Sequence, residues 1–209
     1  PITVSAPDNC IVNAKYPVPV NARHVVGMYV PFPILNALSK VIPEKILAEG
    51  SGAVWTFQVQ GKTGDGQPFT SSMFNYSGGM GARAGKNGLS ATCYPTGVSA
   101  VPIEVLEASI PIEFSKKELI DGSGGQGKFC GGDGQRIGFK MKTEFPWLLN
   151  AIPSRLNIPA QGCNGGGAGR PGSFLINGEQ LLEAKKREMQ PTDEVLMETP
   201  GGGGFGSPA

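Results

Sequence analysis

The sequence predicts an α+β fold that is rich in strands, with a predominantly antiparallel sheet, a few short helices and many glycine-rich turns. Several segments alternate apolar and polar residues, whereas only one shows convincing helical spacing. The 209 residues include 32 glycines and 18 prolines, and the glycines cluster between the alternating segments. That distribution is typical of a folded protein with tight turns, in contrast to a disordered chain. No repeat of 20–50 residues is present.

The clearest helix is predicted over Pro33–Val41. Its apolar side chains recur at helical spacing, a proline lies near the first turn and Pro43 stops the helix. We expect one face of this helix to pack onto a sheet. The residues that define this face are Ile34, Leu35, Leu38, Val41 and Ile42.

Two antiparallel strands are predicted over Val54–Val59 and Phe69–Tyr76, joined by the loop of residues 61–66. Further strands are predicted over Arg136–Lys142 and Glu194–Thr199. The Asn177-Gly178 pair supplies the positive φ angles that a two-residue hairpin turn needs, so it is the strongest local turn signal in the chain.

Two segments leave alternatives open. Leu181–Met189 fits either a short charged helix or one arm of a hairpin. Val101–Phe114 contains Glu104 and Glu107, which a helix would place on one face and a strand would separate. If the two carboxylates flanked a pocket, they would be candidates for general acid and base; ion pairing is the more common role of such a pair.

The charge balance argues against several function classes. Lys and Arg number 18 and Asp and Glu number 17, with no dense basic run, so nucleic acid is not an expected partner. The longest apolar stretches are interrupted well before the ~20 residues needed to cross a bilayer, and no secretory signal opens the sequence. We expect a soluble, cytoplasmic protein. Because the sequence begins at Pro1 in strand-like residues, we expect it to be truncated upstream.

The residues offer no self-sufficient active site. The four cysteines form no CxxC pair, which argues against a zinc site, and free thiols are expected; they are Cys10, Cys93, Cys130 and Cys163. His24 is the only histidine, and a structural role is favoured for it. Gly122–Gly127 and Gly201–Gly206 match GxGxxG, but neither lies between a strand and a helix, as a dinucleotide site requires.

Nine segments resemble, in order and spacing, the C-terminal half of the hydantoinase B/oxoprolinase family. They cover nearly the whole chain, and they are residues 1–4, 11–14, 78–83, 86–91, 101–107, 123–129, 131–135, 165–172 and 198–206. The resemblance implies one unit over residues 1–209, with a possible internal boundary near 145–165. It also implies two departures from the family pattern, because Asn87 replaces an Asp and Cys130 replaces an Arg.

The resemblance further implies a hetero-oligomeric enzyme that uses ATP to open a small cyclic amide such as a hydantoin or 5-oxoproline. ATP would be bound by a hydantoinase A-type partner subunit, and a divalent metal by the N-terminal part of the same subunit. No cofactor or metal is expected on residues 1–209. Two alternatives stay open: a subunit of an acetone or acetophenone carboxylase-like complex, and a structural docking portion without catalytic residues.

The candidate site residues are few. Weak catalytic candidates are Asn13, Arg83, Glu104 and Glu107, and a structural role is favoured for the glycines of the motifs, namely Gly79, Gly81, Gly125, Gly131 and Gly132.

Overall fold

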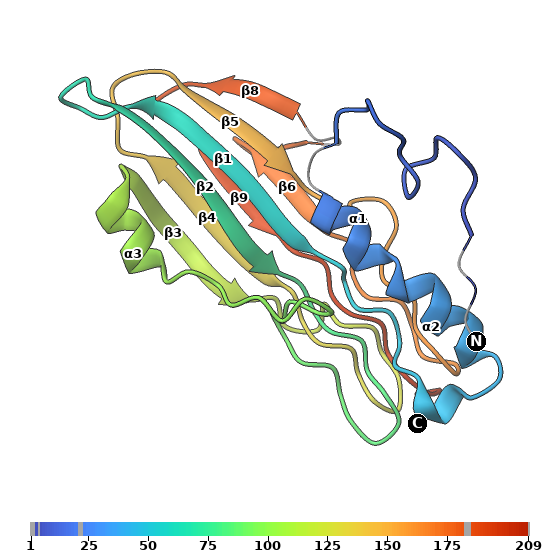
Figure 1. Cartoon of the computed structure of the whole chain (residues 1–209). Helices are drawn as coiled ribbons and strands as arrows, with labels where there is room; N and C mark the ends of the chain where they lie inside the picture. Colours follow the sequence, from blue (N-terminus) through green and yellow to red (C-terminus); the bar gives the residue numbers. More distant parts are fainter. Residues whose placement is uncertain (1–2, 4, 21–22, 182–184, 209) are drawn as a thin grey trace.

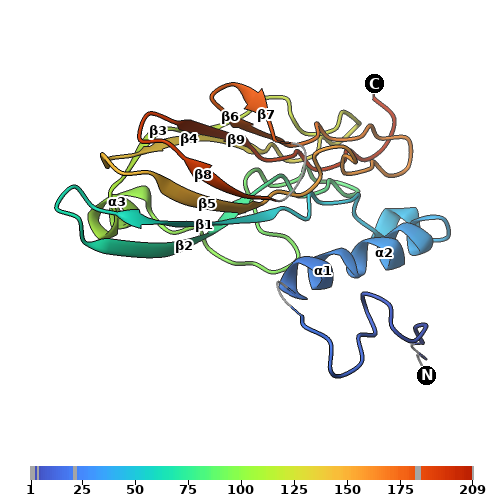
Figure 2. The ribbon, with the colours of Figure 1, turned by 90° about the horizontal axis from the view of Figure 1, so that it is seen from above.

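The computed structural model describes residues 3, 5–20, 23–181 and 185–208. Its described part contains two antiparallel sheets that lie face to face, and a glycine-rich region that extends from one end of them (Figures 1 and 2). The first sheet has the strand order β2-β1-β5-β8, and the second has the order β3-β4-β9-β6-β7. The predicted strand-rich, antiparallel architecture is therefore confirmed, with two sheets in place of one.

The first sheet is built around the predicted strand pair. It consists of β1 (Val54–Lys62), β2 (Pro68–Ser77), β5 (Trp147–Ile152) and β8 (Lys185–Met189). The segment 181–189, which the sequence left undecided, contributes β8, although residues 182–184 lie outside the described part. β5 pairs with β1 on one side and β8 on the other, so residues from both sides of 145–165 share this sheet. A domain boundary in that region stays a prediction.

The second sheet contains the other predicted strands and the hairpin. It consists of β3 (Ile112–Leu119), β4 (Gln135–Met141), β6 (Ser173–Ile176), β7 (Glu179–Gln180) and β9 (Glu194–Glu198). β6 and β7 are joined by Asn177 and Gly178, which have φ angles of 51° and 82°. The predicted hairpin is therefore confirmed.

The core lies between the two sheets. Alternate residues of β1 point inward, and Trp55, Phe57 and Val59 are at most 1% exposed. The ring of Phe57 from the first sheet stacks on that of Phe139 from the second, with centroids 4.9 Å apart. Burial of such aromatic pairs stabilises the contact between the layers.

Four short helical segments accompany the sheets in the described part of the chain: α1 (Arg23–Tyr29), α2 (Pro31–Ser39), the 3-10 helix η1 (Pro43–Lys45) and α3 (Ile103–Ser109). The predicted helix corresponds to α2, shifted by two residues. The expectation for its packing is wrong. Phe32 is the buried side chain of α2, and it packs against the loop at Gly52, whereas Ile34 and Leu38 are 56% and 41% exposed. No described helix is long and apolar enough to cross a membrane.

The glycine-rich segments form a bundle of extended chains around residues 200–206. The N–H groups of residues 201–206 donate in turn to the carbonyls of Arg170, Gly132, Glu49, Gly167, Phe129 and Cys163. Residues 201 and 204 thus face one neighbouring segment, and residues 202 and 205 face another. This repeat of three residues is the periodicity of an extended threefold helix. The interior of the bundle therefore consists of backbone peptide groups, whereas the interior of the sandwich consists of side chains. The glycine-rich sequence predicted turns in these segments, whereas the structure has a bundle of extended chains there.

Candidate functional site

The weak catalytic candidates lie in three separate regions. Glu104 and Glu107 are exposed on α3, which lies at the opposite end of the sheets from the N-terminal segment that carries Asn13 (Figure 1). Arg83 is exposed in a turn closed by backbone hydrogen bonds with Lys86. The helix resolves the open alternative for residues 103–109, yet the fold does not bring these candidates together in one site.

Two of these candidates have structural hydrogen bonds. Glu107 accepts a hydrogen bond of 2.8 Å from the backbone N–H of Phe114, and so ties α3 to the strand that follows it. Asn13 donates from Nδ2 to the carbonyls of Ala6 and Pro7, at 3.2 and 3.1 Å. Both contacts organise local chain geometry.

The five motif glycines occupy positions where no side chain fits. A Cβ atom at each would lie between 1.7 and 2.1 Å from a backbone oxygen of another segment, for Gly79, Gly81, Gly125, Gly131 and Gly132. Those positions require glycine because neighbouring backbones approach there. The two GxGxxG segments meet each other in this bundle, since a Cβ at Gly125 would lie 2.6 Å from the nitrogen of Gly204. Packed backbone occupies the space that a phosphate would need.

The described residues include no group of three or more His, Cys, Asp or Glu side chains able to hold a metal ion. The four cysteines are free thiols, as predicted, and His24 is exposed on α1. Burial raises the pKa of the Cys93 thiol, which makes it a poor nucleophile near neutral pH.

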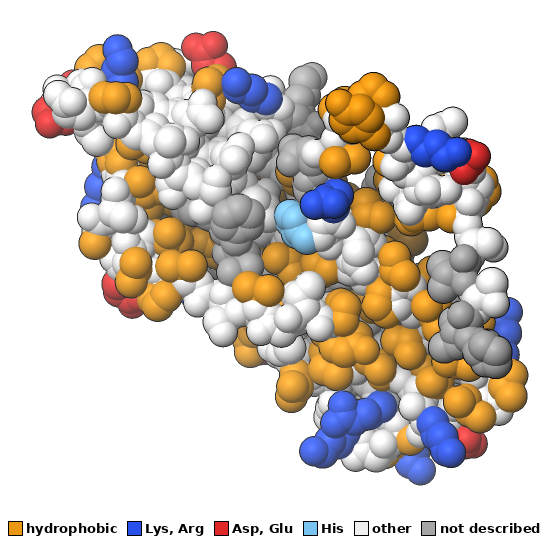
Figure 3. Space-filling model, in the orientation of Figure 1, with side chains coloured by type: hydrophobic (Ala, Val, Ile, Leu, Met, Phe, Trp, Pro, Cys, Tyr) orange, Lys and Arg blue, Asp and Glu red, His pale blue; other side chains and the backbone are white. Residues whose placement is uncertain are grey.

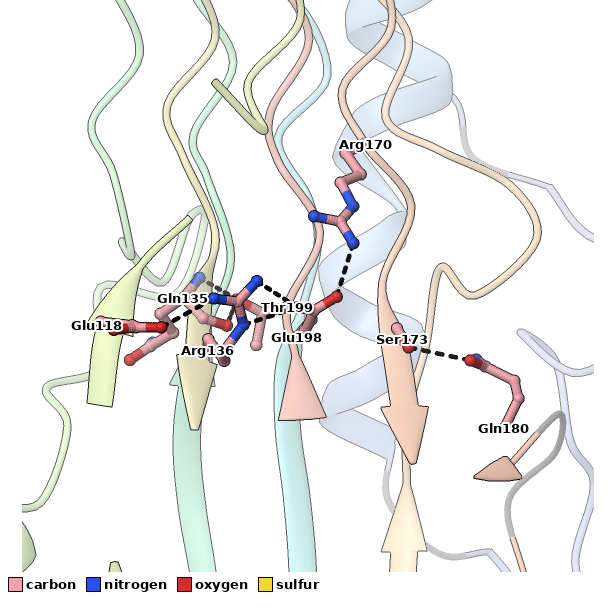
Figure 4. A network of polar contacts seen from close by, with 8 residues as sticks. All are labelled: Glu118, Gln135, Arg136, Arg170, Ser173, Gln180, Glu198 and Thr199. Atoms are coloured by element: carbon pink, nitrogen blue, oxygen red, sulfur yellow. Dashed lines mark hydrogen bonds and ion pairs between the residues drawn. The ribbon is translucent and has the colours of Figure 1, made fainter. Parts of the chain in front are cut away.

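A network of four charged side chains lies where the second sheet meets the glycine-rich bundle (Figure 4). Glu198, from β9, accepts from Arg136 at Oε1 and from Arg170 at Oε2, at 2.8 and 2.7 Å. Arg136, from β4, also donates to Glu118 of β3 at 2.8 Å. Hydrogen bonds from Arg136 to Glu118 and Glu198 raise the pKa of the guanidinium.

This network is balanced in charge, with two arginines and two glutamates. Each carboxylate already has a cationic partner, and none of the residues lines a described cavity. The arrangement links three neighbouring strands and Arg170 of the bundle. Its geometry therefore fits a structural junction between sheet and bundle better than a site for acid and base chemistry.

A buried ion pair lines a cavity of about 620 Å³ beside α2. Nη1 of Arg155 lies 3.1 Å from Oε2 of Glu49, and the two side chains are 8% and 13% exposed. The guanidinium also lies under the rings of Tyr29 and Phe32, at 5.1 and 5.5 Å from their centroids. Stacking on two aromatic faces stabilises the cation in this partly apolar environment.

Further contacts hold the pair in place. Glu49 accepts from Nδ2 of Asn36 at 2.9 Å and from the backbone N–H of Gln161 at 3.0 Å. Arg155 has a φ of 58°, and its Nε atom is buried with no hydrogen-bond partner. A non-glycine residue in this conformation is held there by its surroundings. The pair can orient the cavity wall, but its carboxylate is fully engaged and unsuited to proton transfer.

No pattern in the sequence predicts this site. Arg155 and Glu49 are far apart in the chain, and neither belongs to a recognisable motif. The sequence feature that points to this region is the uncharged segment of residues 25–39, which contains the two aromatic residues of the cavity wall, Tyr29 and Phe32.

Comparison with known proteins identifies the family. The sequence profile described as hydantoinase B/oxoprolinase matches residues 1–208. The chain belongs to this family. Similar members include an uncharacterised protein of Methanocaldococcus jannaschii, 32% identical over 99% of this chain and 36% of its own length. A putative B-type subunit of a D-/L-hydantoinase from a Pseudomonas strain is 27% identical over 100% of this chain and 36% of its own length. A 5-oxoprolinase of Dictyostelium discoideum is 29% identical over 62% of this chain and 11% of its own length.

Solved structures share the fold. An ATP-dependent caprolactamase from Pseudomonas jessenii superposes with a TM-score of 0.72 at 24% identity, covering 82% of this chain and 32% of that one. Acetone carboxylase superposes with a TM-score of 0.61 at 19% identity, covering 82% and 28%. The chain thus spans about a third of the length of the Methanocaldococcus and Pseudomonas relatives and of the two solved structures, and a smaller share of the 5-oxoprolinase.

Proposed function

We propose that this chain is part of a hydantoinase B-type subunit in an ATP-dependent enzyme that hydrolyses cyclic amides. The supporting observation is the family match over residues 1–208, together with relatives named as a B-type hydantoinase subunit and as 5-oxoprolinases. The working enzyme would be a cytoplasmic hetero-oligomer with a hydantoinase A-type subunit that binds ATP. The N-terminal part of the B-type subunit would complete it.

The chemistry needs activation because an unstrained amide is a poor electrophile. In the proposed reaction the amide oxygen attacks the γ-phosphorus of ATP, and ADP leaves. Water then adds to the amide carbon, and the C–N bond breaks to release the amine and leave an acyl phosphate. A second water hydrolyses the acyl phosphate to a carboxylate and inorganic phosphate, which carries away the former amide oxygen. The divalent metal that the family resemblance implies would belong to the N-terminal part of the subunit. The described residues of this chain include no group that fits such a metal.

We assign a structural role to this portion of the subunit. Glu104 and Glu107 lie exposed on α3, and Asn13 and Arg83 lie elsewhere. The glycine-rich bundle and the two charged clusters are engaged with the protein itself. This portion alone is therefore proposed to be inactive, and to hold other parts of the enzyme in position.

The direct test is ATP turnover by the B-type subunit at its natural length, mixed with its A-type partner. Stimulation of ADP release by 5-oxoproline, a hydantoin or caprolactam, with ring opening detected by mass spectrometry, would support the hydrolase. Turnover only with a ketone and bicarbonate would transfer the protein to the carboxylase branch.

The structural role has its own test in the same assay. Glu104→Gln and Glu107→Gln are expected to leave kcat and KM within about twofold of wild type, because removing an acid or base that acts in the transition state lowers the rate by about 10²–10⁴. A loss of that size in either variant would assign catalysis to α3.

A further inference from the structure

The outer side of α2 is apolar and exposed. Ile34 and Leu38 of α2, and Val30 and Val41, which flank it, recur at helical spacing and are 56%, 41%, 48% and 79% exposed. We call these four residues the apolar helix face. Figure 3 shows hydrophobic side chains gathered over the region where α1 and α2 lie. A surface helix normally places such a stripe against the core, so the face lacks the partner that its pattern requires.

The segment that carries this face is also uncharged. Residues 25–39 contain no Asp, Glu, Lys or Arg, although they include all of α2 and most of α1. An exposed pair of helices in a soluble protein usually carries charged side chains. The absence of charge across the segment indicates that its outer side is covered in the assembled protein.

The apolar surface continues beyond α2. The N-terminal segment runs alongside α1 and α2, away from the sheets, and exposes Ile11 at 80% and Tyr16 at 98% (Figures 1 and 2). A groove of about 600 Å³ lies between this segment and α1; five valines line it, and Lys15 and Arg23 also contribute to its wall. On the other side, Ile158 at the cavity of Arg155 is 69% exposed. Exposed apolar side chains thus gather on one side of the molecule, with a few basic side chains among them.

The length of the relatives points to the occupant. This chain covers 36% of the B-type hydantoinase subunit that it matches from end to end, so roughly two thirds of such a subunit lies outside it. The resemblance places the chain in the C-terminal part of the subunit. The remaining part would then connect through the N-terminal segment, directly beside the apolar helix face.

We propose that the apolar helix face is the docking surface for the N-terminal portion of the same hydantoinase B-type subunit. This inference rests on the family assignment and on the subunit organisation in the proposed function, and it goes beyond them by naming the contact. The cavity of Tyr29, Phe32 and Arg155 opens beside the face and would receive apolar side chains from that portion.

Photo-crosslinking tests the proposal without any assay of activity. The photoreactive residue p-benzoylphenylalanine would replace Leu38 or Val41 in the subunit at its natural length, assembled with its A-type partner. We expect crosslinks to peptides of the B-type subunit that lie outside these 209 residues. The matched control is the same probe at Val105, which is 55% exposed on α3, at the far end of the sheets, and is expected to give no such product.

Three outcomes would overturn the proposal. Crosslinks into the A-type subunit would make the face an inter-subunit contact, a product of doubled mass would identify a second copy of the chain, and no product would mean that the face remains exposed. A charge variant gives an independent readout: Val41→Asp should split or lower the unfolding transition of the whole subunit, whereas Val105→Asp should not. Because neither measurement uses substrate, a failure here is distinguishable from an incorrect choice of reaction.

Discussion

The side-chain oxygen of Asn87 accepts a hydrogen bond of 3.0 Å from the backbone N–H of Cys130. These are the two positions at which the sequence departs from the pattern of the family that it resembles, with Asp expected at the first and Arg at the second. The contact places the two departures next to each other in the fold. We therefore expect an Asp and an Arg at these positions to pair, so that replacing only one of them would leave a charge without its partner.

A double-mutant cycle should therefore show coupling between residues 87 and 130. Asn87→Asp and Cys130→Arg together should be more stable than the sum of the single variants, by about 0.5 kcal/mol, as expected for an exposed pair. Urea unfolding at low and high salt would measure this coupling, and salt should reduce it. In a matched cycle that combines Asn87→Ala with Cys130→Arg, residue 87 has no carboxylate to pair with the arginine, so the two changes in unfolding free energy should add. Additivity in both cycles would contradict the inferred pairing.

The glycine-rich bundle should tolerate no side chain at Gly79. A Cβ there would lie 1.7 Å from the carbonyl oxygen of Gly132, and neither backbone can move without breaking hydrogen bonds of the bundle. We expect Gly79→Ala to lower the free energy of unfolding by about 3 kcal/mol or more. A Cβ added at Gly64, in the loop between β1 and β2, would meet no atom within 4 Å, so Gly64→Ala is the control and should change stability little. Equal effects of the two substitutions in urea unfolding would exclude tight packing of the bundle.

Loss of the partner of Arg155 should be strongly destabilising. Glu49→Leu would leave a guanidinium that is 8% exposed without its carboxylate, and would remove the acceptor for Asn36 and Gln161. The expected loss is about 3–5 kcal/mol of unfolding free energy. For comparison, Glu113→Leu removes a 40% exposed carboxylate that faces Lys140 at 3.5 Å, and should cost less than about 1 kcal/mol. Thermal or urea unfolding would measure both, and similar losses would refute the special role of the buried pair.

The stability of the fold should fall at alkaline pH because of Cys93. Burial raises the pKa of this thiol, so the folded state keeps the proton at pH values where the unfolded chain releases it. The contribution is complete below about pH 8.5, the ordinary thiol value, and is lost as the pH rises through the folded pKa. Urea unfolding at neutral pH and near pH 9.5 should show a decline that Cys93→Ala reduces. Cys130→Ala is the control, and an unchanged decline in Cys93→Ala would assign the effect to another group.

Regular alternation made much of the sandwich predictable. In β1 the inward residues Trp55, Phe57 and Val59 are separated by Thr56 and Gln58, and this period of two is visible without a structure. The Asn177-Gly178 turn was predictable because its backbone angles restrict the residue types that can adopt them. In contrast, β3 follows α3 after only two residues. Apolar residues run through both elements, so the sequence did not show where the helix ends and the strand begins.

Other features depend on contacts between distant parts of the chain. The helical spacing of Ile34 and Leu38 predicted the helix correctly, but spacing alone does not tell whether the apolar stripe faces this chain or a partner. Arg155 and Glu49 meet only because residues 46–51 and 159–162 lie side by side along the bundle, linked by the hydrogen bond from the Glu49 N–H to the Gln161 carbonyl. No local pattern encodes that proximity.

The glycine-rich bundle affects how the folded state will appear in solution. Extended threefold helices are also a major conformation of unfolded chains. In far-UV circular dichroism the bundle will therefore add the signal usually attributed to disorder, and a fully folded sample will look partly denatured. Amide hydrogen exchange separates the two cases, because the N–H groups of residues 201–206 are all hydrogen-bonded within the bundle and will exchange slowly.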